Sequence, residues 1–287
     1  MELSRRRFAR LAGTAALAGP RLTGQQTALT AQQAIERIQK NAGVPWLPES
    51  LDTIEAGDPA ALITGIATTS MATMDVLTRA SKEKANLVVT LEPAFFGRLD
   101  APLADDPVYR AKKEFIAKNG MVVWRFSDHW RARKPDPLAT GLGVTLAWTE
   151  YQVGDDPARY ELPGMRLAAL ADHLAQRLHA SAGIRVVGDP QTRVRRVSLL
   201  PGTSALPATM KALPASDVVI AGEVREWESV EYAQDTVASG QKKGFITLGR
   251  VLSEEPGMEL CAQWLKTLIP EVPVRWMRTG DPYWRPA

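Results

Sequence analysis

The chain has 287 residues, of which 45% are apolar and 23% are charged, as in an ordinary globular protein. This length supports one large α/β domain or two lobes with a hydrophobic core. The single cysteine, Cys261, excludes an intrachain disulfide, and no stretch approaches the ~20 apolar residues of a membrane span.

The first 18 residues have the pattern of an export signal. Residues 4–10 read SRRRFAR, and a short, weakly apolar run follows at residues 11–18 and ends in Ala-Leu-Ala. This order is typical of a secretory signal with a cleavage site after Ala18, and the paired arginines before Phe8 resemble the twin-arginine class. The sequence therefore predicts export by the twin-arginine route to the periplasm or beyond the cell, which leaves residues 19–287.

Removal of this segment changes the charge of the chain. Residues 1–18 contain four of the 35 basic residues and one of the 32 acidic residues, so residues 19–287 hold 31 of each. The basic excess of the full chain therefore belongs to the signal. Without such an excess, nucleic-acid binding loses its electrostatic support, and we expect neither a nucleic-acid partner nor a membrane after signal removal.

The first lobe is expected over about residues 30–130. Residues 25–41, 71–80 and 105–119 show the spacing of amphipathic helices, whereas residues 60–67, 85–90 and 121–126 are short apolar runs typical of buried strands. Strands that alternate with helices pair in parallel. Residues 85–97 read ANLVVTLEPAFFG, so Glu92 stands at the carboxyl end of a strand, where ligands bind in open α/β sheets.

The remaining chain divides into a connecting segment, about residues 131–190, and a second lobe, about residues 191–280. Residues 131–143 are basic and rich in proline and glycine, which predicts a surface loop, and periodicity does not decide between helix and strand for residues 144–151. A strand at 158–162 and a helix at 165–180 follow. The second lobe is expected to have strands at 194–200, 217–221, 244–248 and 272–277, with helices between them and at 257–268. The fold class is thus α/β, with two similar lobes that carry mixed or parallel sheets and face a central cleft.

Polar residues follow several of these strands. They are Glu92, Asp128 and His129, Glu223 and Glu226, and Glu254 and Glu255. Acids that begin a helix are also favoured by its dipole, which accounts for the later pairs without a ligand. Glu92 needs a partner because a buried carboxylate is costly, and that partner is either a metal ion or one of Arg98, Arg125 and Arg250.

Three stretches resemble the NIF-three-like dinuclear metal centre family, also described as GTP cyclohydrolase type-two homologues. They read ANLVVTLEPAFF, VRRVSLLPGTSALPATMKALPASDVVIAGEV and FITLGRVLSEEPGMELCAQWL, and in order they cover most of residues 30–277. The resemblance implies two α/β lobes around a cleft with two divalent metals, in a hexameric ring.

The resemblance also implies the site residues. Glu92 and Glu254 match family carboxylate ligands, whereas Leu91 and Arg250 stand where the family has histidine. Leucine offers no lone pair, and arginine stays protonated and repels a cation. Asp128 lies near the family's next ligand corner, which predicts metal ligands Glu92, Asp128 and Glu254 and catalytic residues Asp128 and His129. The predicted cofactor is Mg, Mn or Zn, although such an oxygen-rich set suits Mg, Mn or Ca better than Zn.

Two functions follow from these observations. The first is an exported hydrolase in which a divalent metal activates water for attack on a small substrate, for example a nucleotide-like one. The second is a non-catalytic oligomeric binding or scaffold protein that keeps the fold and has lost the metals. Glu254 follows Arg250 by four residues, a spacing at which an ion pair can form on a helix without metal.

Overall fold

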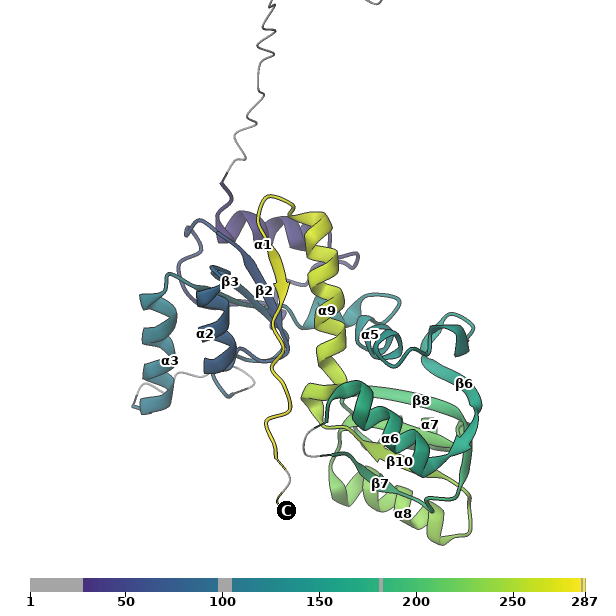
Figure 1. Cartoon of the computed structure of the whole chain (residues 1–287). Helices are drawn as coiled ribbons and strands as arrows, with labels where there is room; N and C mark the ends of the chain where they lie inside the picture. Colours follow the sequence, from purple (N-terminus) through teal and green to yellow (C-terminus); the bar gives the residue numbers. More distant parts are fainter. Residues whose placement is uncertain (1–27, 98–104, 181–182, 285, 287) are drawn as a thin grey trace, which may run out of the picture.

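The chain forms two lobes, each built on one β-sheet, in a computed structural model that describes residues 28–97, 105–180, 183–284 and 286 (Figure 1). This arrangement confirms the expected α/β fold of two lobes with mixed sheets. The predicted signal at residues 1–18 and its cleavage site after Ala18 lie outside the described residues, as does Arg98.

The first sheet has five strands. In spatial order they are β1 (Ile54–Ala56), β4 (Val122–Arg125), β3 (Leu87–Thr90), β2 (Ile66–Thr69) and β11 (Val274–Trp276). All neighbours are parallel except β1 and β4. The helices of this lobe are α1 (Ala31–Lys40), α2 (Met74–Lys82), α3 (Pro107–Lys118) and the short α4 (Asp128–Ala132).

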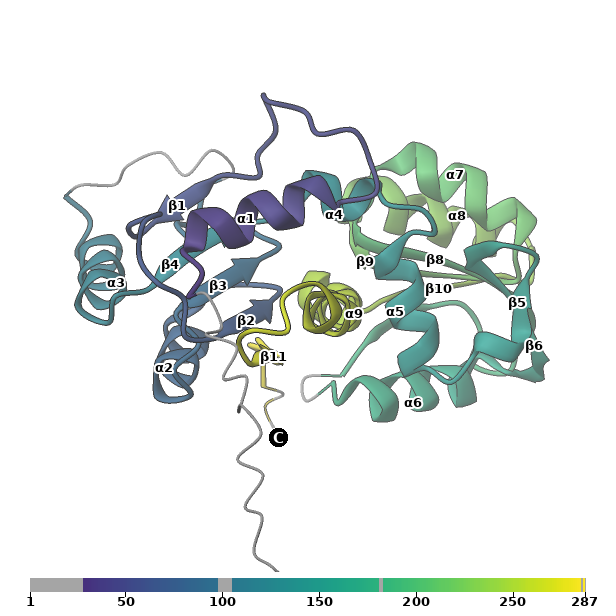
Figure 2. The same ribbon diagram turned by 90° about the horizontal axis from the view of Figure 1, so that it is seen from above.

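Alternate residues of these strands pack into two separate cores. Leu87 and Val89 face a core that includes α1, whereas Val88 faces a core that includes α2. A strand points successive side chains to opposite faces, so the continuous apolar run at residues 87–89 reflects burial on both faces. Figure 2 shows α1 on one side of the sheet and α2 and α3 on the other.

The second sheet has six strands. In spatial order they are β5 (Gln152–Val153), β6 (Asp156–Arg166), β8 (Arg193–Thr203), β9 (Val218–Glu223), β10 (Gly244–Thr247) and β7 (Arg185–Val187). Strand β9 pairs in parallel with β8 and with β10. The other pairs of neighbouring strands in this sheet are antiparallel. The helices are α5 (Pro137–Thr145), α6 (Leu167–Leu178), α7 (Leu206–Ala215) and α8 (Glu231–Ala238), with a 3₁₀ turn (Thr149–Tyr151) and a π-helical turn (Glu226–Val230).

Helix α9 (Arg250–Leu268) joins the two lobes (Figure 1). Leu252, near its start, belongs to the core of the second lobe, whereas Cys261 and Leu265 belong to a core of the first. The chain then returns through β11, which pairs with β2. Residues 272–277, which the sequence analysis placed within the second lobe, therefore complete the first sheet, and β5 to β7 of the predicted connecting segment belong to the second sheet.

The prediction of a surface loop at residues 131–143 is wrong for most of that range. Asp136 accepts hydrogen bonds at the start of α5 from Leu138 and Ala139, and Pro137 occupies the first helical turn. The glycines that indicated a loop are instead places of close contact. A Cβ on Gly141 would lie 2.5 Å from the carbonyl oxygen of Pro256 in α9, so the composition reflects helix packing.

The last long helix begins earlier than the predicted helix at residues 257–268. Gly249 has φ +83°, a conformation that favours glycine, and it ends the connection from β10 so that α9 begins at Arg250. Pro256 lies inside the helix, where it removes one backbone donor without ending the helix. Glu254 and Glu255 therefore lie within α9 and do not precede it. Across the parts of the chain that the structure describes, no helix has the length and apolar character for crossing a membrane.

Candidate functional site

Four charged side chains meet between the two lobes. Glu92 follows β3, and Arg131 lies on α4, directly after the neighbouring strand β4. Arg250 and Glu254 lie on the first turns of α9. The carboxyl ends of parallel strands share one sheet edge, so β3 and β4 place the first two residues together. Helix α9 brings the other two from the far end of the sequence.

The four side chains form one ion-pair network, which we call the Arg–Glu network. Nη2 of Arg131 lies 2.6 Å from Oε1 of Glu92 and 2.8 Å from Oε1 of Glu254. Arg250 lies 3.1 Å from Glu92 Oε2 and 3.4 Å from Glu254 Oε1. Each arginine thus contacts both carboxylates, and the predicted ion pair between Arg250 and Glu254 is confirmed.

Burial makes this network electrostatically strong. Glu254 is fully buried and Glu92 is 7% exposed. Burial raises the pKa of Glu92 above its ordinary value of 4.5, and the nearby Glu254 raises it further, whereas Arg250, Arg131 and Arg125 act in the opposite direction. Burial alone would lower the pKa of Arg131, but its attraction to Glu254 and Glu92 and the hydrogen bonds with them outweigh burial, so the Arg131 pKa is raised.

The second lobe closes tightly over the network. Gly202, at φ +74°, leaves so little room that a Cβ there would lie 2.8 Å from Glu254 Oε1 and 2.9 Å from Arg131 Nη1. Ser253 Oγ accepts a hydrogen bond from the backbone N–H of Gly202 at 3.0 Å and donates one to the Arg250 carbonyl. Ser70 of the first lobe donates to Glu254 Oε2 at 3.2 Å. Both lobes therefore hold Glu254 in place.

The predicted catalytic pair is engaged elsewhere. His129 Nδ1 lies 2.6 Å from Asp52 Oδ2, and its Nε2 accepts a hydrogen bond from the backbone N–H of Leu47 at 2.8 Å. Its ring stacks on Trp46 with 3.6 Å between centroids and is 2% exposed. Asp128 Oδ2 accepts from the backbone N–H of Leu51 at 2.9 Å. The structure therefore places both residues in contacts with residues 46–52, and neither forms a described contact with Glu92 or Glu254.

The other predicted polar residues have separate partners. Glu223 accepts from Arg250 Nη1 at 3.3 Å at the edge of the network, whereas Glu226 pairs with Arg185 on the surface. Glu255 holds the segment after β11, because it accepts from Arg278 Nε at 3.1 Å and from the backbone N–H of Gly280 at 2.6 Å. Leu91 is fully buried in the core of the first lobe.

These side chains do not fit a divalent metal. Glu92 and Glu254 are the predicted ligands that the fold brings together, and two guanidinium groups already lie within ion-pair distance of both. A cation between them would face two fixed positive charges. Within residues 28–97, 105–180, 183–284 and 286, no group of three or more His, Cys, Asp or Glu side chains could hold a metal ion.

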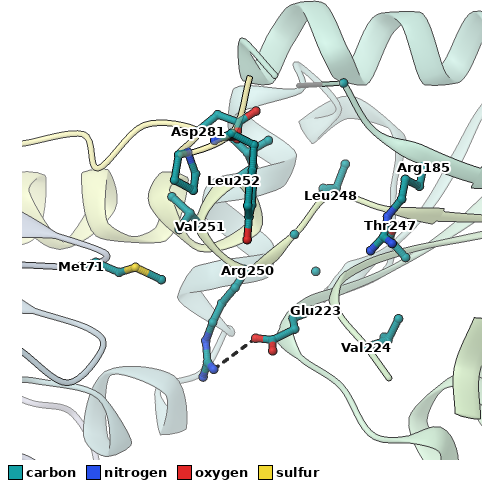
Figure 3. A pocket seen from close by; sticks show the side chains of 15 residues that line it. Met71, Arg185, Glu223, Val224, Thr247, Leu248, Arg250, Val251, Leu252 and Asp281 are labelled. Atoms are coloured by element: carbon teal, nitrogen blue, oxygen red, sulfur yellow. Dashed lines mark hydrogen bonds and ion pairs between the residues drawn. The ribbon is translucent and has the colours of Figure 1, made fainter. Parts of the chain in front are cut away.

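Two cavities open on either side of Arg250 and Met71. The larger, of about 690 Å³, lies at the ends of β9 and β10 and the start of α9 (Figure 3). The smaller, of about 530 Å³, lies between the start of α2 and the segment after β3, and Glu92 lines it. Both volumes fall in the range of small-molecule sites. The cleft thus offers space for a ligand beside the Arg–Glu network.

Sequence reasoning missed Arg131 and Asp52. The sequence predicts that Arg131 begins a surface loop and indicates Arg98, Arg125 and Arg250 as partners of Glu92. A helix assignment for residues 128–132 would have placed Arg131 one turn after a strand neighbouring β3, which is the available signal. Asp52 lies in an irregular segment, and nothing in its local sequence indicates that it binds the start of α4.

Comparison with known proteins supports the fold. No family model matches the sequence, and no curated protein matches it either. Three solved structures share its architecture over 89% of this chain. Protein ybgI, described as of unknown function, has a TM-score of 0.70 at 18% identity and is covered over its full length. Staphylococcus aureus protein SA1388 has a TM-score of 0.67 at 13% sequence identity, and 98% of its chain is covered. A Bacillus cereus protein related to NIF3 has a TM-score of 0.65 at 14% sequence identity, and 99% of its chain is covered. The chain therefore has the fold of these proteins.

Proposed function

We propose that this chain is a NIF-three-like protein that binds a small molecule in the cleft between its lobes and holds an ion-pair network where the family has metals. The observation that carries the proposal is that Arg131 and Arg250 each contact both Glu92 and Glu254. The shared fold with a protein related to NIF3 supports the family assignment. This function corresponds to the non-catalytic alternative of the sequence analysis.

The network suits a binding protein for a physical reason. Two guanidinium groups neutralise two buried carboxylates, which would otherwise be very costly. The network thereby holds α9, α4 and the end of β3 in one arrangement without an ion. The two cavities that meet at Arg250 remain available for a ligand.

Metal content per chain tests this proposal. Residues 19–287, purified without a His tag, are incubated with Mg, Mn or Zn, dialysed and measured by elemental analysis. We expect no ion above the level of a chelator-treated control, because the arginines repel a cation. An ion that survives dialysis in the wild-type chain and is lost in Glu254→Gln would contradict the proposal.

A metal-dependent hydrolase is the second candidate. Its one support is that Glu92, a buried carboxylate, lines the smaller cavity, and the two arginines that pair with Glu92 and Glu254 count against it. Such an enzyme requires the ion that the elemental analysis seeks. The same measurement therefore separates the two functions, and a retained ion would direct substrate screens to hydrolysis.

Export of the chain by the twin-arginine route is part of the proposal, supported by residues 4–18. We expect residues 1–27 fused to a fluorescent reporter to direct it to the periplasm of a bacterial host. Replacing Arg5, Arg6 and Arg7 with lysine should keep the reporter in the cytoplasm, and unchanged export would contradict the twin-arginine route. The hexameric ring stays a prediction from the resemblance, and light scattering of the purified chain measures it.

A further inference from the structure

The smaller cavity beside the Arg–Glu network has largely apolar walls. It lies among the start of α2, the segment after β3, and α3, and Figure 2 shows both helices on the same side of the first sheet. Its apolar lining includes Met71 just before α2, Met74 at the start of α2, Phe96 after β3 and Val108 in α3. Methionine side chains adapt to ligands of varied shape. A cavity with these walls therefore suits a ligand with an apolar body.

Phe96 has a backbone conformation that is unusual for an aromatic residue. Its φ of +70° lies in the left-handed region, which favours glycine and costs free energy for a residue with a side chain. The side chain is 62% exposed, so burial of the ring within the chain offsets only part of that cost. Glycine would make the same turn without strain. An exposed aromatic ring held in a strained turn beside a cavity indicates a contact with a ligand.

Positive charge predominates among the charged residues that line this cavity. They are Lys112, Arg125, Arg250 and one carboxylate, Glu92. Glu92 already pairs with Arg131 and Arg250, so its negative charge is largely neutralised. The side chain of Arg250 is 32% exposed, which places part of this positive charge within reach of a ligand. A ligand with an anionic group is therefore favoured over a cationic one.

Lys112 brings positive charge against the aromatic wall. The residue is 4% exposed, and its ammonium donates a hydrogen bond to the carbonyl oxygen of Ala94. Its Nζ lies 5.3 Å from the centroid of the Phe96 ring, a distance at which a cation is attracted to an aromatic face. Glu55 accepts a hydrogen bond from the backbone N–H of Ala94 at 2.6 Å, but it is not among the residues that line the cavity. A ring that packs on Phe96 would thus bring its substituents close to a buried cation.

We propose that the smaller cavity binds a small aromatic acid. The ring of the ligand packs against Phe96 and the two methionines, and its anionic group faces the side lined by Lys112, Arg125 and Arg250. Aromatic packing and attraction between opposite charges act together in such a site, because both strengthen where water is excluded. This inference rests on the proposed function, since it names the ligand class of the same cleft.

Calorimetric titration of the full mature chain, residues 19–287, with indole-3-acetate, tryptophol and tryptamine tests the proposal. The three compounds share one ring system and carry an anionic, a neutral and a cationic end. We expect indole-3-acetate to bind ~10-fold more tightly than tryptophol, because only its carboxylate interacts with the cationic side of the cavity. Tryptamine should bind most weakly. Equal affinities for the three compounds would overturn the assignment of an acid.

Phe96→Gly tests the aromatic wall, because it removes the ring and keeps a residue that adopts the left-handed conformation without strain. We expect it to weaken binding of indole-3-acetate by ~10-fold or more, while the urea midpoint of unfolding stays close to that of the wild-type chain. A purely structural role for Phe96 would instead lower the midpoint and leave the affinity of the folded chain unchanged. Phe96→Tyr keeps an aromatic ring and should bind as the wild-type chain does.

Trp227→Ala is the matched control. Trp227 is also an exposed aromatic residue with a cation near its ring, since the guanidinium carbon of Arg225 lies 5.7 Å from the ring centroid. It lies on the π-helical turn of the second lobe and is not among the residues that line the smaller cavity. Its replacement should leave binding unchanged. If Phe96→Gly does not fold, Phe96→Asn takes its place, because asparagine also adopts the left-handed conformation.

The outcomes separate this inference from the proposed function. If indole-3-acetate binds equally to the wild-type chain and Phe96→Gly, the chain holds a ligand but the site in the smaller cavity is overturned. If none of the three compounds binds to the wild-type chain, the ligand class is overturned, whereas the elemental analysis still decides between the ion-pair network and a metal.

Discussion

Arg131→Met should lower the free energy of unfolding by about 3–5 kcal/mol, because it leaves two buried carboxylates without their closest partner. Arg131 Nη2 lies within 2.8 Å of both Glu92 and Glu254, and Glu254 is fully buried. Methionine keeps much of the side-chain volume, so the loss reports on charge. Urea denaturation at neutral pH measures the effect.

Arg195→Met is the control for this prediction. Arg195 pairs with Glu161 at 2.9 Å, but both side chains are largely exposed. Arg195→Met should therefore lower the free energy of unfolding by no more than about 1 kcal/mol. Adding Glu254→Gln to Arg131→Met should recover part of the lost stability, because the buried charge is removed along with its partner. Equal effects of Arg131→Met and Arg195→Met would show that the network does not stabilise the fold.

Asp52→Ala should lower the free energy of unfolding by about 3–4 kcal/mol, because this buried carboxylate accepts hydrogen bonds from several groups at once. Its oxygens accept from the backbone N–H groups of Ser127, Asp128 and His129 at 2.6, 2.8 and 3.0 Å. It also lies 2.6 Å from His129 Nδ1. The side chain of Ser127 does not cap α4, so Asp52 provides this cap from a distant part of the chain. Urea denaturation again gives the measurement.

Asp189→Ala tests whether the loss is specific to Asp52. Asp189 also accepts a backbone hydrogen bond, from Gln191 at 2.8 Å, but it lies in an exposed turn. Water can replace that hydrogen bond, so we expect Asp189→Ala to lower the free energy of unfolding by less than about 1 kcal/mol. A similarly small loss for Asp52→Ala would mean that residues 46–52 do not hold His129 and the start of α4 in place.

Local sequence predicted the regular elements well where the pattern is strong. The apolar run at residues 87–90 became β3, and the spacing of Leu167, Leu170 and Leu174 became the buried face of α6. It also placed Glu92 at a strand end, because proline at residue 93 cannot continue a ladder. It failed at residues 131–143, where glycines that contact another helix resemble the glycines of a loop.

The sequence by itself determined the α/β class, many of the strands and helices, and the position of Glu92 at a strand end, because periodicity, proline and glycine act within a few residues. Only the tertiary structure decided that β11 joins the first sheet and that Arg131 bridges the two glutamates. Arg131 lies 39 positions from Glu92 and 123 from Glu254, so no local pattern could pair them. The physical reason is that the packing of α4 and α9 determines which charged side chains lie within ion-pair distance of Glu92 and Glu254. That packing depends on contacts from both lobes.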